Sequence, residues 1–186
     1  MNLSHCFEKG MVINMNNKTK KLVFAALMAA LTYVATIIIQ IPSPTNGYIH
    51  PGDGLVFLSG VLLGPLYGGL AAGIGSMFVD LLSGYTHYVL GTFVIKMLAA
   101  MACGFLCKSL TAKVKNPVPR TMISGLTGAL IIVVGYFLYE SLYLGYGFAA
   151  ASGVLGNIAQ TVFGIITVTI LYPLLMKANI MRIMNE

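Results

Sequence analysis

Long apolar stretches make up most of this chain, and short polar segments rich in glycine and proline separate them. An α-helix rises 1.5 Å per residue, so about 20 apolar residues span the hydrocarbon core of a bilayer. Pro42–Gly47 and Asn116–Pro119 are strong loop signals between such stretches. The pattern predicts helices over approximately residues 22–41, 53–63, 66–83, 88–108, 120–144 and 149–177.

The stretch from Leu55 to Leu82 can form one long helix or a hairpin that turns at Gly64-Pro65. Basic residues decide between them, because Lys and Arg gather in cytoplasmic loops. A hairpin gives six crossings and brings all basic clusters to one side. We therefore expect an all-α integral membrane protein, a six-transmembrane-helix bundle with both termini cytoplasmic. The clusters are Lys18, Lys20 and Lys21; Lys108, Lys113, Lys115 and Arg120; Lys177 and Arg182.

Composition supports a membrane protein. The chain is 58% hydrophobic and only 9% charged, with a mean hydropathy of +0.86. The net charge of +6 does not indicate nucleic-acid binding, because the basic residues flank apolar stretches. The 186 residues allow one membrane domain, 18–186, after a polar cytosolic tail, 1–17, in which Met11 or Met15 is an alternative start.

Four charged residues lie within the apolar stretches: Asp53, Asp80, Lys96 and Glu140. A charge at the bilayer centre costs about 2.5–3.5 kcal/mol on insertion scales, so each needs a partner, water or a ligand. In the six-crossing topology all four lie in the outer half of the bundle. Two histidines, His50 and His87, fall at the same end.

Lys96 shares a helix face with Tyr88 and Thr92, at successive spacings of four residues. Asp80, near the outer end of the preceding helix, is the expected counter-ion of Lys96. Two interpretations of this pair remain open. It can lock two helices together, or it can contact a ligand along one edge.

The predicted helix 120–144 carries Tyr136, Tyr139, Glu140 and Tyr143 at i, i+3, i+4 and i+7, which places them on one face. Tyrosines near an outer helix end can belong to the interfacial aromatic belt. An ionised carboxylate does not face lipid, however, so Glu140 favours the wall of a pocket.

Two amides, Asn157 and Gln160, lie three residues apart on the last predicted helix. Amides in a membrane helix bond either to neighbouring helices or to a ligand. The first helix carries four alanines at small-xxx-small spacing, which permits close helix approach within the bundle or by a partner subunit. The alanines are Ala25, Ala26, Ala29 and Ala30.

Several catalytic motifs are absent from the sequence. It has no GxxxxGK[ST] phosphate-binding loop, no HExxH motif and no GxSxG elbow. Its three histidines are too scattered to indicate a metal site. We expect no catalytic residue, no metal and no cofactor bound by this chain, so any ATP must be hydrolysed by partner subunits.

These residues resemble the substrate-binding S components of energy-coupling factor (ECF) vitamin transporters, over about residues 18–178. The similarity is greatest to the branch assigned to hydroxymethylpyrimidine or pyridoxine. The alanine cluster is similar to the motif with which that family docks its coupling subunit. The most specific segments are Pro51–Gly54, Ser59–Pro65, Gly73–Ser76, Asp80–Tyr85 and Thr92–Lys96.

The resemblance implies a multi-pass plasma-membrane protein of a prokaryote that partners a membrane T component and two cytosolic ATPases, whether dedicated or shared. It further implies an outward pocket for a small vitamin, covered by a lid at Pro42–Gly52. The expected substrate-binding residues are His50, Asp53, Asp80, Tyr85, His87, Tyr88, Lys96, Tyr136, Tyr139, Glu140, Tyr143, Asn157 and Gln160.

Two other functions remain open at this stage. Asp80, Lys96 and Glu140 could form the ion path of a self-sufficient secondary transporter or channel. An intramembrane enzyme acting on lipid lacks support, because no nucleophile–base set is recognisable.

Overall fold

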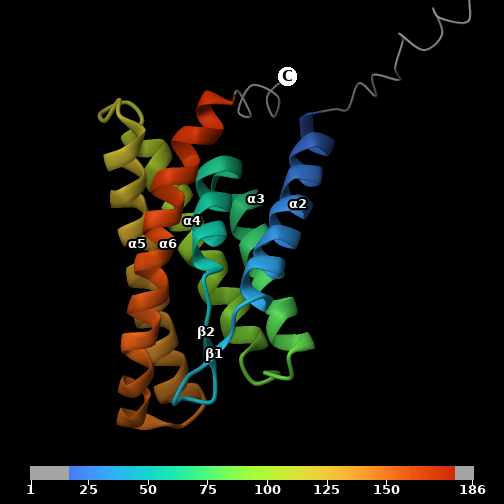
Figure 1. Cartoon of the computed structure of the whole chain (residues 1–186), viewed down its shortest axis with the longest axis vertical. Coiled ribbons are helices and arrows are strands. Elements are labelled where there is room, and N and C mark those ends of the chain that lie inside the picture. The colour runs from blue at the N-terminus through green and yellow to red at the C-terminus, as the bar shows by residue number, and fades with distance from the viewer. Residues whose placement is uncertain (1–16, 179–186) are drawn as a thin grey trace, which may run out of the picture.

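The computed structural model describes residues 17–178, which form a bundle of helices packed side by side (Figure 1). Five helices in this part of the chain are long and apolar enough to cross a membrane, which confirms the all-helical membrane class. The predicted tail lies outside the described residues apart from Asn17. The helices are α2 (Asn17–Ile37), α3 (Asp53–Leu82), α4 (Val89–Leu110), α5 (Pro117–Leu138) and α6 (Ala151–Lys177).

Helix α3 contains a break at which the chain reverses. Gly64 has φ 79° and ψ 178°, a backbone region open essentially only to glycine, and Pro65 then starts the second arm with its fixed φ. The Ser59 hydroxyl donates to the Gly68 carbonyl at 2.9 Å. Nine residues of straight helix would separate these groups by about 13 Å, so the two arms lie side by side.

A short β-hairpin follows α2 and crosses one end of the bundle (Figure 1). Its strands are β1 (Ile41–Pro42) and β2 (Tyr48–Ile49), which pair antiparallel with Ile41 opposite Ile49. The predicted helix 22–41 therefore extends too far, because α2 ends at Ile37. Pro42 and Pro44 cannot donate helical hydrogen bonds, and they favour extended backbone instead.

Helix α5 does not continue regularly to residue 144. It passes into a π-helix, η1 (Tyr139–Tyr143), and a 3-10 turn, η2 (Gly147–Ala150), leads into α6. Single π-helical turns of this kind occur frequently at functional sites.

The first arm of α3 packs closely against α4. A Cβ at Gly60 would lie 2.1 Å from the Ala100 carbonyl oxygen, and one at Gly104 would lie 2.3 Å from the Gly60 carbonyl oxygen. Small residues thus let the two backbones touch, as in other membrane helix pairs. The β-hairpin defines one end of the bundle, called here the pocket end. The start of α2 and the end of α6 lie at the opposite end (Figure 1).

Candidate functional site

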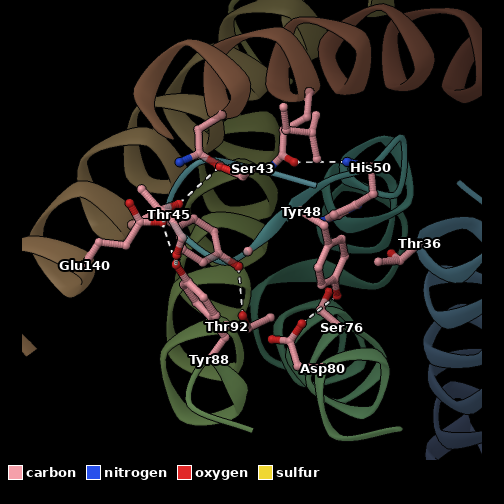
Figure 2. Close-up of a pocket in the computed structure, with 15 residues that line it drawn as sticks. Thr36, Ser43, Thr45, Tyr48, His50, Ser76, Asp80, Tyr88, Thr92 and Glu140 are labelled. Atoms are coloured by element: carbon pink, nitrogen blue, oxygen red, sulfur yellow. Dashed lines mark hydrogen bonds between the residues drawn. The ribbon is translucent and has the colours of Figure 1, made fainter. Parts of the chain in front are cut away.

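A polar pocket lies under the β-hairpin at the pocket end (Figure 2). The free volume is only about 30 Å³, room for a few water molecules. All five long helices, the segment of the β-hairpin after β1 and the π-helix η1 contribute to its lining. The lining residues are Thr36, Ser43, Thr45, Gly47, Tyr48, Ile49, His50, Ser76, Asp80, Tyr88, Thr92, Tyr136, Glu140, Asn157 and Gln160.

Asp80 lies in this pocket on the second arm of α3, 2% exposed. The Tyr48 hydroxyl from β2 donates to its Oδ1 at 2.5 Å (Figure 2). Burial, reinforced by the Asp80 charge, raises the pKa of Tyr48 well above its usual value, so the phenol stays protonated and keeps donating. The second oxygen, Oδ2, is buried without a hydrogen-bond partner among the described residues.

The expected Asp80–Lys96 ion pair is wrong, because Lys96 pairs with Asp53 instead. Both side chains of that pair are fully buried, and the Lys96 ammonium also lies 5.3 Å from the Tyr136 ring centroid. Depth explains the difference. Lys96 lies about 12 Å along α4 from Tyr88, whereas Asp80 lies within one turn of the end of α3. Asp53 is the first residue of α3 and lies at the same depth in the bundle as Lys96, so the two side chains can pair.

Glu140 faces the pocket from η1, and its side chain is almost fully buried. The Thr45 hydroxyl donates to its Oε1 at 3.1 Å, and the Tyr88 hydroxyl lies 3.0 Å from the same atom. The Tyr88 hydroxyl also lies 2.7 Å from the Thr45 carbonyl oxygen, and its single proton must serve both acceptors. Oε2 of Glu140 has no partner among the described residues.

His50 follows β2 and is 7% exposed. Its Nδ1 accepts the Gly52 backbone N–H at 3.1 Å, and its own backbone N–H donates to Gln160 Oε1 at 3.3 Å. Burial, with a smaller contribution from the Lys96 charge, lowers the pKa of His50 to about 3. The ring is therefore neutral near pH 7, and with Nδ1 accepting, its proton lies on Nε2.

Four buried polar atoms that belong to pocket residues lack a hydrogen-bond partner within residues 17–178. A buried polar atom without a partner costs about 1–3 kcal/mol, so such groups mark where a bound molecule would supply donors. Two are carboxylate oxygens and two are hydroxyls. They are Asp80 Oδ2, Glu140 Oε2, Ser76 Oγ and Thr36 Oγ1.

Seven of the expected binding residues line the pocket: His50, Asp80, Tyr88, Tyr136, Glu140, Asn157 and Gln160. Asp53 and Lys96 form the buried ion pair next to it, Lys96 beneath the ring of Tyr136.

The remaining four residues surround the lining as a layer of aromatic rings. Tyr85 lies 4.8 Å from the Tyr48 ring, and His87 lies 4.7 Å from the Tyr88 ring. Tyr139 lies 6.1 Å from Tyr88, and its hydroxyl donates to the His87 carbonyl at 2.7 Å.

The fourth of these residues, Tyr143, corrects the predicted pocket wall. It stacks on Tyr139 and is 68% exposed. The expected single face of Tyr136, Tyr139, Glu140 and Tyr143 is therefore wrong. The π-helix changes the angular spacing, so only Tyr136 and Glu140 line the pocket.

Sequence reasoning missed Thr36, Ser43, Thr45, Tyr48 and Ser76 as site residues. Three of them, Ser43, Thr45 and Tyr48, belong to the segment 42–52 that is expected to form the lid. The sequence therefore indicates the segment but not these individual residues. Thr36 and Ser76 gave no signal, because isolated small hydroxyl residues are common in membrane helices, where they bond to backbone carbonyls.

The four alanines line a separate apolar groove of about 620 Å³ between α2 and the second arm of α3. Ala25 and Ala29 are half-buried, whereas Ala26 and Ala30 are exposed. A Cβ at Gly75 would lie 2.4 Å from the Ala29 carbonyl oxygen, so the alanine face also packs within the bundle.

The fold and site define an integral membrane protein with a polar pocket at one end. Residues 16–177 match the family model described as "ECF-type riboflavin transporter, S component". The chain belongs to this family of S components, and it is a multi-pass plasma-membrane transport protein, not an enzyme. Members work with a membrane T component, ATPases and a small vitamin ligand.

Two relatives extend the comparison. The chain is 35% identical over 134 residues to an uncharacterized protein of Pyrococcus woesei, covering 72% of this chain and 86% of that protein. It is 26% identical over 169 residues to the thiamine precursor transporter HmpT of Lactococcus lactis subsp. cremoris, covering 90% of this chain and 94% of the relative.

Proposed function

We propose that this chain captures a water-soluble vitamin or precursor of the pyridoxine or hydroxymethylpyrimidine class for ATP-driven uptake. One observation carries the proposal: in the pocket, Asp80 and Glu140 each keep one buried carboxylate oxygen that has no partner within residues 17–178. Ligand hydroxyl, amino or ring N–H groups would supply the missing donors. Charge-assisted bonds of this kind contribute about 1.5–3 kcal/mol each.

The aromatic lining of the pocket supports a flat ligand. The Tyr48, Tyr88 and Tyr136 rings can stack on a heterocycle. A ligand of about a dozen heavy atoms needs about 1 kcal/mol per atom for nanomolar binding, below the ceiling of about 1.5. The relative that transports a thiamine precursor favours this class over the larger riboflavin that the family description names, and the lid must move to admit either ligand.

The β-hairpin acts as the lid in this proposal. Tyr48 ties it to α3 through Asp80, and Thr45 ties it to η1 through Glu140. The same two carboxylates therefore hold the lid and face the ligand. The lid bonds to one oxygen of each carboxylate and the ligand would bond to the other, so that a bound ligand and the closed lid are held by the same two side chains.

The proposed topology has six crossings, with the arms of α3 as two of them and both termini in the cytoplasm. Release into the cell is driven by two cytosolic ATPases through the T component, which docks on the alanine groove. Ala26→Trp and Ala30→Trp fill this groove from exposed positions and should abolish co-purification with the T component. Leu130→Trp, on the exposed surface of α5, is the matched control.

Titration calorimetry of the purified protein with pyridoxine, hydroxymethylpyrimidine and riboflavin tests the substrate. Nanomolar binding of either small vitamin, with riboflavin at least 100-fold weaker (about 2.7 kcal/mol), is expected. Tight riboflavin binding alone would overturn the substrate class. Ion-gradient-driven uptake by the chain alone in vesicles would instead support the secondary-transporter alternative.

A further inference from the structure

A second cavity, of about 460 Å³, lies at the end of the bundle opposite the pocket. We name it the basic cavity, because Lys21 of α2, Lys108 of α4 and Arg120 of α5 all line it. Its remaining lining is mostly apolar. Val61, Leu62 and Met176 are among these apolar residues, and Tyr172 also lines the cavity.

Arg120 is the unusual member of this lining, because it is only 5% exposed. Its Nη2 donates to the Tyr172 hydroxyl at 3.2 Å, and its guanidinium carbon lies 5.6 Å from the centroid of that ring. Its Nε is buried without a hydrogen-bond partner among residues 17–178. Arginine remains protonated in proteins, so burial leaves a positive charge that a neutral phenol does not balance.

No carboxylate within residues 17–178 lies near this charge. That part of the chain has three carboxylates, and all lie in or beside the pocket: Asp53 with Lys96, Asp80 with Tyr48, and Glu140 with Thr45. Arg120 also occupies the first turn of α5, where the helix dipole adds positive potential. A buried guanidinium in this position calls for an anion.

We propose that the basic cavity binds the phosphate group of an anionic phospholipid, held by Arg120 with Lys108 and Lys21. Guanidinium and phosphate form charge-assisted bidentate hydrogen bonds. Basic pockets between helices at a membrane face suit anionic headgroups. The apolar side chains of Val61, Leu62 and Met176 provide a surface for the upper acyl chain. The shared chemistry is phosphate, so free inorganic phosphate is the competing source.

The test uses full-length protein purified in a neutral detergent and titrated with phosphatidylglycerol, phosphatidylcholine or inorganic phosphate. Thermal melts and lipid retention in native mass spectrometry are the two readouts. Phosphatidylglycerol should raise the melting temperature and remain bound as one molecule per chain, whereas phosphatidylcholine should do neither. Arg120→Gln should weaken phosphatidylglycerol binding by about 10- to 150-fold, and Lys108→Gln by about fivefold.

Lys113→Gln is the matched control, because Lys113 is an exposed lysine after α4 that does not line the cavity. It should leave phosphatidylglycerol binding unchanged. If Arg120→Gln does not fold, Lys108→Gln still decides. Equal losses in the Lys108 and Lys113 variants would show surface charge alone and overturn the proposal.

Three further outcomes would overturn it. One is phosphatidylcholine acting as well as phosphatidylglycerol. A second is inorganic phosphate matching and displacing the lipid, which would assign the cavity to a free anion. The third is no lipid effect but loss of T-component binding in Arg120→Gln, which would assign it to a partner carboxylate.

Discussion

The Lys96 ammonium contacts the Asp53 carboxylate in the interior of the bundle, 43 positions apart in the sequence and with neither side chain exposed. The contact joins the start of α3 to the middle of α4 directly beneath Tyr136 of the pocket. Asp53 also lies in the first turn of its helix, where the helix dipole favours a carboxylate. The pair is thus placed to stabilise the part of the pocket that Tyr136 lines.

A mutant cycle tests this pair. Removing one partner leaves a buried charge uncompensated, so Lys96→Met should lower the free energy of unfolding by about 3–5 kcal/mol. Adding Asp53→Asn should recover part of that loss. Asp80→Asn combined with Lys96→Met is the control and should give an additive loss, since these residues are not partners. Thermal melts in detergent of wild type, the three single variants and the two double variants complete both cycles, and additivity in the Asp53 cycle would exclude the pairing.

Glu140→Gln probes ligand recognition, because it keeps the shape of the side chain and removes its charge. Ligand affinity should fall by about 10- to 150-fold, the equivalent of one charge-assisted hydrogen bond. Tyr139→Phe should change affinity little, because its hydroxyl donates to the His87 carbonyl outside the pocket lining. Calorimetry on both variants checks this, and an unchanged affinity in Glu140→Gln would remove Glu140 from the site.

Tyr48→Phe tests the lid, because it deletes the hydroxyl that ties β2 to Asp80 while retaining the ring. The lid should open more often, so ligand dissociation should speed up by about tenfold or more, with a smaller change in association. Tyr85→Phe is the matched control, since Tyr85 contacts the Tyr48 ring but does not line the pocket. Stopped-flow exchange measures both rates. Equal dissociation rates in Tyr48→Phe and wild type would refute the proposal that the bond from Tyr48 to Asp80 holds the lid closed.

Much of this architecture could be predicted from the sequence. A helix that spans lipid needs a long apolar stretch, so the positions of the helices follow from the distribution of apolar residues. A charged residue within such a stretch indicates a polar site inside the bundle. Asp80 and Glu140 were identified on that basis. The partner of Lys96 was not, because pairing depends on the relative depth of helices, which spacing along one helix does not reveal. Tyr143 was misplaced because the π-helix at residues 139–143 breaks the regular periodicity.

His50 gives a pH dependence with a definite sign. Burial lowers its folded-state pKa to about 3, against 6.5 for the unperturbed side chain. Between these values the unfolded chain binds a proton that the folded chain does not, so stability falls as pH decreases from 6.5. The contribution is about 1.4 kcal/mol per pH unit in that window. Melts of wild type and His50→Asn between pH 7 and pH 5 should show a shallower slope in the variant. Parallel slopes would contradict a neutral, buried His50.

The effect of Gly64→Ala on stability distinguishes a hairpin at Gly64-Pro65 from one continuous helix, because the two topologies predict opposite signs. Gly64 has positive φ, and a Cβ there would meet no atom within 4 Å, so Gly64→Ala acts through backbone strain alone. The strain should cost about 1–3 kcal/mol. In one continuous helix the same change would stabilise by about 1 kcal/mol, because alanine is the better helix former. Ser59→Ala should also destabilise, because it removes the hydroxyl that donates to Gly68 across the two arms. Thermal melts that show a more stable Gly64→Ala protein would restore the single long helix and with it a five-crossing topology.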